Sequence, residues 1–88
     1  MIQCDIIERA MLENPQIKWW YAKDFQHGKY FIGYEASARM SDLYRIRPTL
    51  FNLGKDGRFR ILSINWDNKK EVEEEKKRLD IKNDENIR

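Results

Sequence analysis

The sequence is poor in residues that build covalent or metal-linked frameworks. Its 88 residues include one cysteine, Cys4, and one histidine, His27. A single cysteine cannot close an intramolecular disulfide, and one Cys with one His cannot supply a zinc-ligand set. The composition therefore excludes a disulfide-stapled extracellular mini-protein and a zinc finger.

Long apolar runs are also missing. No stretch approaches the roughly 20 apolar residues of a membrane-spanning helix, and none has the hydrophobic region of a secretory signal. Internal repeats and low-complexity linkers are absent as well. We therefore expect one domain with no membrane association and a cytoplasmic location.

Catalytic signatures are equally scarce. The sequence has no glycine-rich phosphate loop, no nucleophile elbow and no cluster of metal ligands. Cys4 and His27 have no third group spaced to orient them for nucleophilic chemistry. We expect a protein that is not an enzyme and that holds no metal and no cofactor.

Charge is what the sequence has in excess. Charged residues make up 36% of the chain, against roughly 25% in an average domain, yet the formal net charge is only +2. From Arg39 to Arg60 there are six basic and two acidic residues, a net charge of +4. From Asp67 onward 15 of the 22 residues are charged. We expect a domain over residues 1–66 and a solvated, charged C-terminal helix or tail over 67–88, partly frayed.

The first half of the chain predicts two helices joined by a short strand. Asp5 and Glu8 have the spacing of a capping box, and an apolar stripe follows that Asn14-Pro15 ends. The stripe consists of Ile6, Ile7, Ala10 and Met11. Residues 17–21 are aromatic and predicted to be extended, and residues 22–26 allow only a short helix before Gly28.

Residues 34–45 predict the third helix, because they contain no Gly or Pro and Pro48 follows. At helical spacing one face carries Ala36, Met40, Leu43 and Tyr44, which we expect in the core. The opposite face carries Tyr34, Ala38, Ser41 and Arg45, flanked by Ser37 and Asp42. This second face is predicted to be small, polar and exposed.

A β-hairpin is predicted over residues 49–64. Residues 49–53 and 58–64 read as strands around Gly54-Lys55-Asp56-Gly57, whose Asp-Gly pair favours a tight turn. Strand alternation places Phe59 and Ile61 on an apolar underside and Arg58 and Arg60 on a basic outer face.

This order of elements resembles a winged helix-turn-helix domain over about residues 5–64. Residues 20–25 (Trp-Tyr-Ala-Lys-Asp-Phe) look like the first helix of the helix-turn-helix, and residues 34–43 like the recognition helix. Gly57-Arg58-Phe59 stands where small bacterial and phage members have the wing. The resemblance implies an α+β fold with a three-helix core, a C-terminal hairpin wing and here an additional charged helix, in a bacterial cell or phage-infected host.

The resemblance also implies a double-stranded DNA partner and a role in regulation, such as transcription regulation, or as an accessory factor. Helix 34–45 would read the major groove, since small side chains let a helix approach base edges, and hairpin 49–64 would hold the backbone. The expected DNA-binding residues are Tyr34, Ser37, Ala38, Ser41, Arg45, Lys55, Arg58 and Arg60.

Other interpretations remain open. Arg58 and Arg60 could be ordinary charges of an exposed strand, and Arg39 could form a structural ion pair. Of the four large aromatic residues at 19, 20, 30 and 31, at least two are expected in the core. The main alternative function is a protein-interaction adaptor or inhibitor that uses the Trp19-Trp20-Tyr21 patch or the tail. A homodimer built through the last helix is a third hypothesis.

Overall fold

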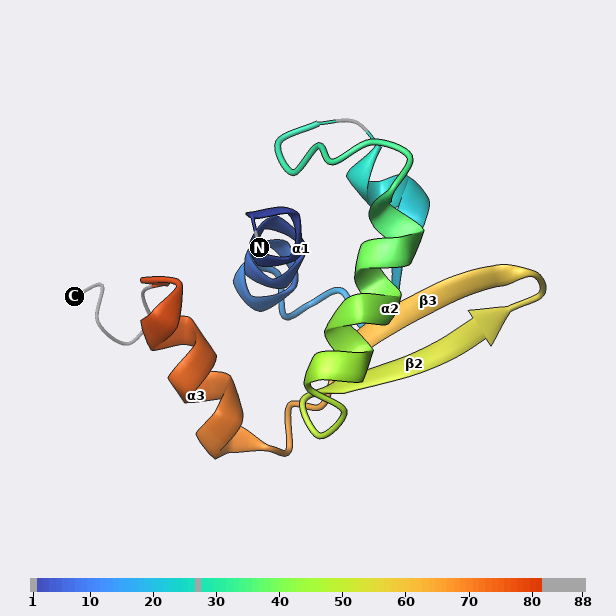
Figure 1. Ribbon diagram of the computed structural model, residues 1–88. Helices are drawn as coiled ribbons and strands as arrows, with labels where there is room; N and C mark the ends of the chain where they lie inside the picture. Colours follow the sequence, from blue (N-terminus) through green and yellow to red (C-terminus); the bar gives the residue numbers. More distant parts are fainter. Residues whose placement is uncertain (1, 27, 82–88) are drawn as a thin grey trace.

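The computed structural model describes residues 2–26 and 28–81, which form an α+β domain. The described elements are α1 (Ile2–Glu13), β1 (Trp20–Tyr21), the 3-10 helix η1 (Ala22–Phe25), α2 (Ala36–Ile46), β2 (Phe51–Asp56), β3 (Phe59–Ile64) and α3 (Lys69–Arg78). The three strands form an antiparallel sheet in the order β1-β3-β2. In Figure 1 the β2–β3 hairpin projects beyond the helices at one end, α3 lies at the other, and α1 lies between α2 and α3.

Helix α1 supplies much of the core through its apolar stripe. Ile7, Ala10 and Met11 are buried as expected. The predicted N-cap at Asp5 is wrong, because the helix already begins at Ile2. Glu8 therefore lies inside the helix rather than in its first turn, and its side chain is 1% exposed.

The segment between α1 and α2 is anchored by aromatic side chains. The ring of Trp20 stacks on that of Phe25 with centroids 5.3 Å apart, and both side chains are buried. The Phe25 carbonyl accepts hydrogen bonds from the backbone N–H groups of Ile32 and Gly33. The Tyr30 hydroxyl donates to Glu13 and its ring packs against the core. Two of the four large aromatic residues thus serve the core, as the sequence predicts.

Helix α2 follows the expected pattern with two corrections. Its buried residues are Ala36, Met40 and Leu43, but Tyr44, predicted in the core, is 37% exposed because it lies at the edge of the buried face. The helix begins at Ala36 rather than at Tyr34, which lies in the preceding turn. Glu35 at the N-cap makes no side-chain capping bond.

The hairpin lies within the expected residues 49–64, but β2 runs from Phe51 to Asp56 rather than over 49–53, and the turn is shifted. Asp56 pairs with Phe59, so the two-residue turn is Gly57-Arg58 rather than residues 54–57. Gly57 has φ +64°, at the position where a type II′ turn takes glycine. Strand β2 continues through Gly54, which pairs with Ile61, and the Trp19 ring lies beside it: a Cβ at Gly54 would lie 3.5 Å from that ring.

Helix α3 lies within the charged C-terminal segment expected over 67–88, and one of its faces is docked on the domain. Asn68 caps it by accepting a bond from the Glu71 backbone N–H. Val72, Glu75 and Leu79 are buried, and the Leu79 carbonyl accepts a bond from the Arg9 guanidinium. The expected frayed end, residues 82–88, lies outside the described residues. No helix within the described ranges has the length and apolar character needed to cross a membrane.

Candidate functional site

The exposed face of α2 consists of the small and polar side chains expected there. Tyr34, just before the helix, is 93% exposed. Ala38 and Arg45 are exposed, and Ser37 and Ser41 are half-buried. The face is therefore accessible to a large ligand.

Ion pairs engage half of the basic residues between 39 and 60. Asp42 binds both Arg39, with 3.0 Å between Nη2 and Oδ2, and Arg45. Arg47 pairs with Glu75 of α3 at 3.1 Å. Arg39 is thus a structural ion-pair residue, one of the two alternatives open at the sequence level. The remaining three basic residues of this stretch, Lys55, Arg58 and Arg60, lie on the hairpin.

The basic side chains of the hairpin differ in orientation. Lys55 and Arg58 are exposed, with Arg58 in the turn. Arg60, expected on the outer face, is half-buried instead: its Nη1 lies 3.4 Å from the Ser37 hydroxyl oxygen and 3.5 Å from the Ser37 carbonyl oxygen. Arg60 therefore connects the hairpin to the N-terminal end of α2.

Phe59, expected on the apolar underside, is 61% exposed. Burial does not alternate along β3: Ile61 to Ile64 are all buried, whereas the outer end of the strand is not. At the outer end of the hairpin nothing in the core reaches the Phe59 ring, so an apolar strand position becomes part of the surface.

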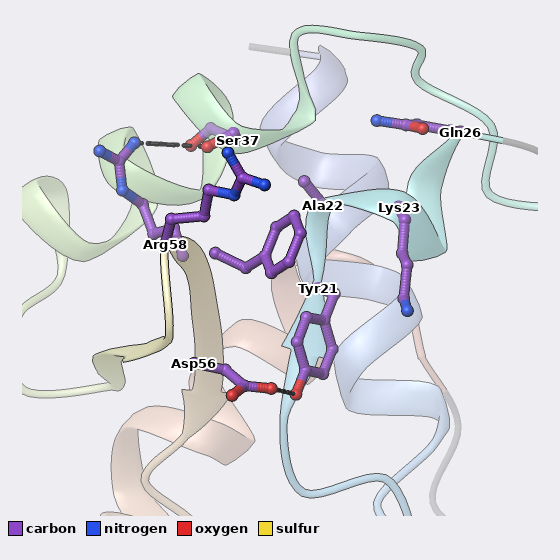
Figure 2. A pocket seen from close by; sticks show the side chains of 9 residues that line it. Tyr21, Ala22, Lys23, Gln26, Ser37, Asp56 and Arg58 are labelled. Atoms are coloured by element: carbon purple, nitrogen blue, oxygen red, sulfur yellow. Dashed lines mark hydrogen bonds between the residues drawn. The ribbon is translucent and has the colours of Figure 1, made fainter.

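A hollow of about 510 Å³ lies between the hairpin, η1 and the start of α2. Figure 2 shows its walls, with Lys23 contributed by η1 and Arg58 by the hairpin turn. The lining residues are Tyr21, Ala22, Lys23, Gln26, Ser37, Asp56, Arg58, Phe59 and Arg60. Three of them are cationic and one is acidic, so the hollow favours an anion.

The one carboxylate of the hollow is held by a tyrosine. The Tyr21 hydroxyl donates to Asp56 Oδ2 with 2.5 Å between the oxygens (Figure 2). This hydrogen bond to a carboxylate raises the pKa of Tyr21 above its ordinary value. The bond ties the end of β2 to β1, and it directs the Asp56 charge towards Tyr21. Lys23 Nζ lies 5.2 Å from the centroid of the same ring.

The structure brings only some of the predicted site residues together. Ser37, Arg58 and Arg60 share the hollow, whereas Tyr34, Ala38, Ser41 and Arg45 follow α2 and Lys55 lies on β2. The sequence did not indicate Ala22, Gln26, Asp56 or Phe59 as site residues, gave Lys23 no role, and indicated Tyr21 only through the adaptor hypothesis. A signal was available in the Arg-Phe-Arg run at 58–60, which places an aromatic residue between two cations. Strand alternation alone assigned that aromatic residue to the core side.

A second charged cluster lies between α1, α3 and the end of α2. Arg78 binds Asp5 at 3.0 Å, Glu8 at 3.4 Å and Glu75 at 2.8 Å. With Arg47, the cluster has three carboxylates and two guanidinium groups. One carboxyl group must be protonated for these charges to balance.

Glu8 is that group. Burial, then the hydrogen bond to Glu75 and the charge of Glu75, raise the pKa of Glu8 to about 8, although Arg47 and Arg78 oppose the shift. Burial on its own would raise the pKa of Glu75. The pKa is lowered instead, because burial is outweighed by the hydrogen bonds with Glu8 and Arg78 and by the charges of Arg47 and Arg78. The two carboxyl groups therefore share one proton at neutral pH, which makes this cluster a structural element.

Within residues 2–26 and 28–81, no group of three or more His, Cys, Asp or Glu side chains has an arrangement that could hold a metal ion. Comparison with family models, with curated proteins and with solved structures gave no match. The case for a function therefore depends on the geometry and charge of the surfaces described above.

Proposed function

We propose that this chain is a winged helix-turn-helix protein that binds double-stranded DNA, with α2 in the major groove and the β2–β3 hairpin on the sugar-phosphate backbone. The order α1-β1-η1-α2-β2-β3 agrees with the resemblance in the sequence. Pairing of β1 with β3 fixes the hairpin to the rest of the domain, so the hairpin and α2 can engage one ligand together.

The observation that carries the proposal is the convergence of cations at the N-terminal end of α2. Arg58 and Arg60 of the hairpin and Lys23 of η1 border the same hollow as Ser37. Hydroxyl groups, cations and helix N-termini are the common phosphate contacts of DNA-binding proteins. The small exposed residues Ala38 and Ser41 leave room for base edges beside α2.

The charge that remains for DNA is local rather than global. Arg39, Arg45 and Arg47 are engaged by acidic neighbours, and the cations of α3 lie at the opposite end of the molecule from the hairpin (Figure 1). One copy would therefore make few phosphate contacts and bind with modest affinity. A second copy or a second protein would raise the affinity in the complex.

The adaptor hypothesis requires exposed tryptophan side chains, but Trp19 is half-buried and Trp20 is buried. Trp20 is 5% exposed, and Trp19 packs on Gly54. Among the described residues, the large apolar side chains that are more than half exposed, Phe31, Tyr34, Ile46 and Phe59, do not belong to the predicted Trp19-Trp20-Tyr21 patch. The basic hollow therefore favours DNA over the adaptor.

A salt series of duplex binding tests the proposal. Fluorescence anisotropy of a labelled random-sequence duplex should show affinity falling steeply as salt rises from about 50 mM, because phosphate contacts release counterions. The double variant Arg58→Ala/Arg60→Ala should bind several-fold more weakly and reduce the logarithmic salt slope by about two.

The matched control is Lys70→Ala/Lys77→Ala, which removes the same charge from exposed positions of α3. This control should keep the affinity and the salt slope of the unmodified chain. Absence of duplex binding at about 50 mM salt, or an equal loss in both double variants, would overturn the proposal.

A further inference from the structure

The hollow between the hairpin and η1 combines features that backbone contact alone does not require. Its volume of about 510 Å³ lies within the roughly 300–1,000 Å³ typical of small-ligand sites. Duplex backbone lies against flat basic surfaces and needs no such recess. Its walls have a cationic part and an apolar part.

The cationic part of the walls is suited to phosphate. Lys23, Arg58 and Arg60 come from three positions in the chain and border one recess. Asp56 accepts a hydrogen bond from Tyr21 and keeps its negative charge, so the three cations exceed it by two. Arg60 is held in place by Ser37, so one guanidinium group and one hydroxyl group are already oriented before a ligand arrives.

The apolar part of the walls is suited to a planar ring. Phe59 is 61% exposed and lies between the two arginines in sequence. Tyr21 and Ala22 form the neighbouring wall. Gln26 adds an amide that can both donate and accept hydrogen bonds, as the polar edge of a nucleobase requires.

We propose that this hollow binds a single unstacked nucleotide, with the base against Phe59 and its phosphate on Lys23, Arg58 and Arg60. The nucleotide can come from an unpaired end of a DNA strand or from solution, because both present a base beside a phosphate. The strand source deepens the proposed function and rests on it: the protein would bind a duplex with a single-stranded end more tightly than a blunt duplex. The free-nucleotide source does not depend on it.

The first experiment compares a blunt duplex with the same duplex carrying a three-nucleotide overhang, using the full chain. Stacking of one base on an aromatic side chain contributes about a five- to hundredfold gain in affinity. We expect a gain in that range for the overhang over the blunt duplex, lost in Phe59→Ala and recovered in Phe59→Tyr, with each variant's own affinity for the blunt duplex as the reference for its ratio.

Phe31→Ala is the matched control, because Phe31 is 59% exposed but does not line the hollow. It should keep the overhang gain. If Phe59→Ala keeps the gain, or if Phe31→Ala loses it equally, the hollow does not bind the unpaired end of a DNA strand.

The second experiment titrates thymidine 5′-monophosphate into the chain while backbone amide NMR signals of residues 21–26 and 56–60 are followed. Saturable shifts that thymidine without phosphate does not produce support the free-nucleotide source. If neither the overhang nor the mononucleotide binds at the hollow, the inference is wrong. Blunt-duplex binding decides the proposed function separately, since that measurement does not involve an unpaired base.

Discussion

The two ends of the molecule are both rich in charge, but they use it in opposite ways. At the α1–α3 end, Arg47 and Arg78 are paired with Asp5, Glu8 and Glu75, and two of these carboxylates are almost completely buried. At the hairpin end, Lys23, Arg58 and Arg60 surround an open hollow whose one carboxylate is bonded to Tyr21.

The difference shows that charged side chains stabilise the fold where opposite charges meet away from water. Where like charges border an open hollow, they are available to a ligand. Burial makes an unpaired charge costly, so a buried carboxylate of the first end needs a cation or a proton. Cations in a water-filled hollow do not need an internal partner. Substitutions should therefore affect stability at one end and ligand binding at the other.

The largest effect is expected from Arg78→Ala. Arg78 contacts three carboxylates, so its removal leaves Glu8 and Glu75 buried with Arg47 alone. Breaking a buried ion pair costs about 3–5 kcal/mol; because the Arg78 side chain is 41% exposed, we expect roughly 2–3 kcal/mol in urea unfolding. Arg58→Ala should change stability by less than about 0.5 kcal/mol. Equal losses in the two variants would remove the distinction between the two ends.

The next effect is the pH dependence that Glu8 imposes. Its pKa rises from 4.5 to about 8 on folding, so the folded chain keeps a proton that the unfolded chain releases. The contribution to stability is complete below about pH 4.5 and is lost as pH rises towards 8. Asp5, Glu75, Arg47 and Arg78 face the same cluster, and the lowered pKa of Glu75 acts oppositely, removing stability only in acid.

Urea unfolding between pH 5 and 9 should show a decline of roughly 2 kcal/mol, since the titration is shared with Glu75. Glu8→Gln keeps a neutral donor for Glu75 and should flatten this decline. A profile unchanged by Glu8→Gln would assign the pH dependence to another group.

A smaller effect, on binding alone, is expected from Ala38→Glu. Ala38 is exposed on α2, and a carboxylate there would face the phosphates and occupy the space near the base edges. We expect about a tenfold loss of duplex affinity with little change in stability. The control Lys70→Ala changes the net charge equally on α3 and should leave binding intact. If both variants lose affinity equally, α2 is not the contact surface.

The smallest effect is expected from Lys55→Ala. Lys55 is exposed on β2, opposite Arg60 in the pairing register, and its loss should remove about one unit of the salt slope. Duplex affinity should fall only a few-fold at low salt, equally for different sequences. A loss that depends on sequence would show that Lys55 contacts bases rather than phosphate.

Much of the fold could be predicted because it follows from local pattern. Apolar spacing indicated the buried faces of α1 and α2, and the Asp-Gly pair at Gly57 indicated a tight turn. These signals work because helix faces and turns are decided by residues within a few positions of one another. The element boundaries were less accurate, as with Asp5, Tyr34 and the strand that continues through Gly54.

The site was predicted less well than the fold, since it depends on contacts between distant residues. Ser37, Arg58 and Arg60 were among the expected residues and line the hollow. Phe59 and Tyr44 were placed in the core by periodicity, which indicates a face but does not reveal where the opposing layer ends. The docking of α3 was missed for the same reason: Glu8 and Glu75 are far apart in sequence, and their shared proton exists only once the helices meet.

The sequence by itself determined the α+β class, the order of elements and the concentration of basic residues between 39 and 60, because composition and short-range periodicity are sufficient for each. Tertiary structure decided which of those charges remain available. It paired Arg39, Arg45 and Arg47 with carboxylates, turned Arg60 towards Ser37 and gathered Lys23, Arg58 and Phe59 around one hollow. The physical reason is that an ionic or aromatic side chain acquires its role from the groups within a few ångströms of it, and in this chain those groups come from other elements.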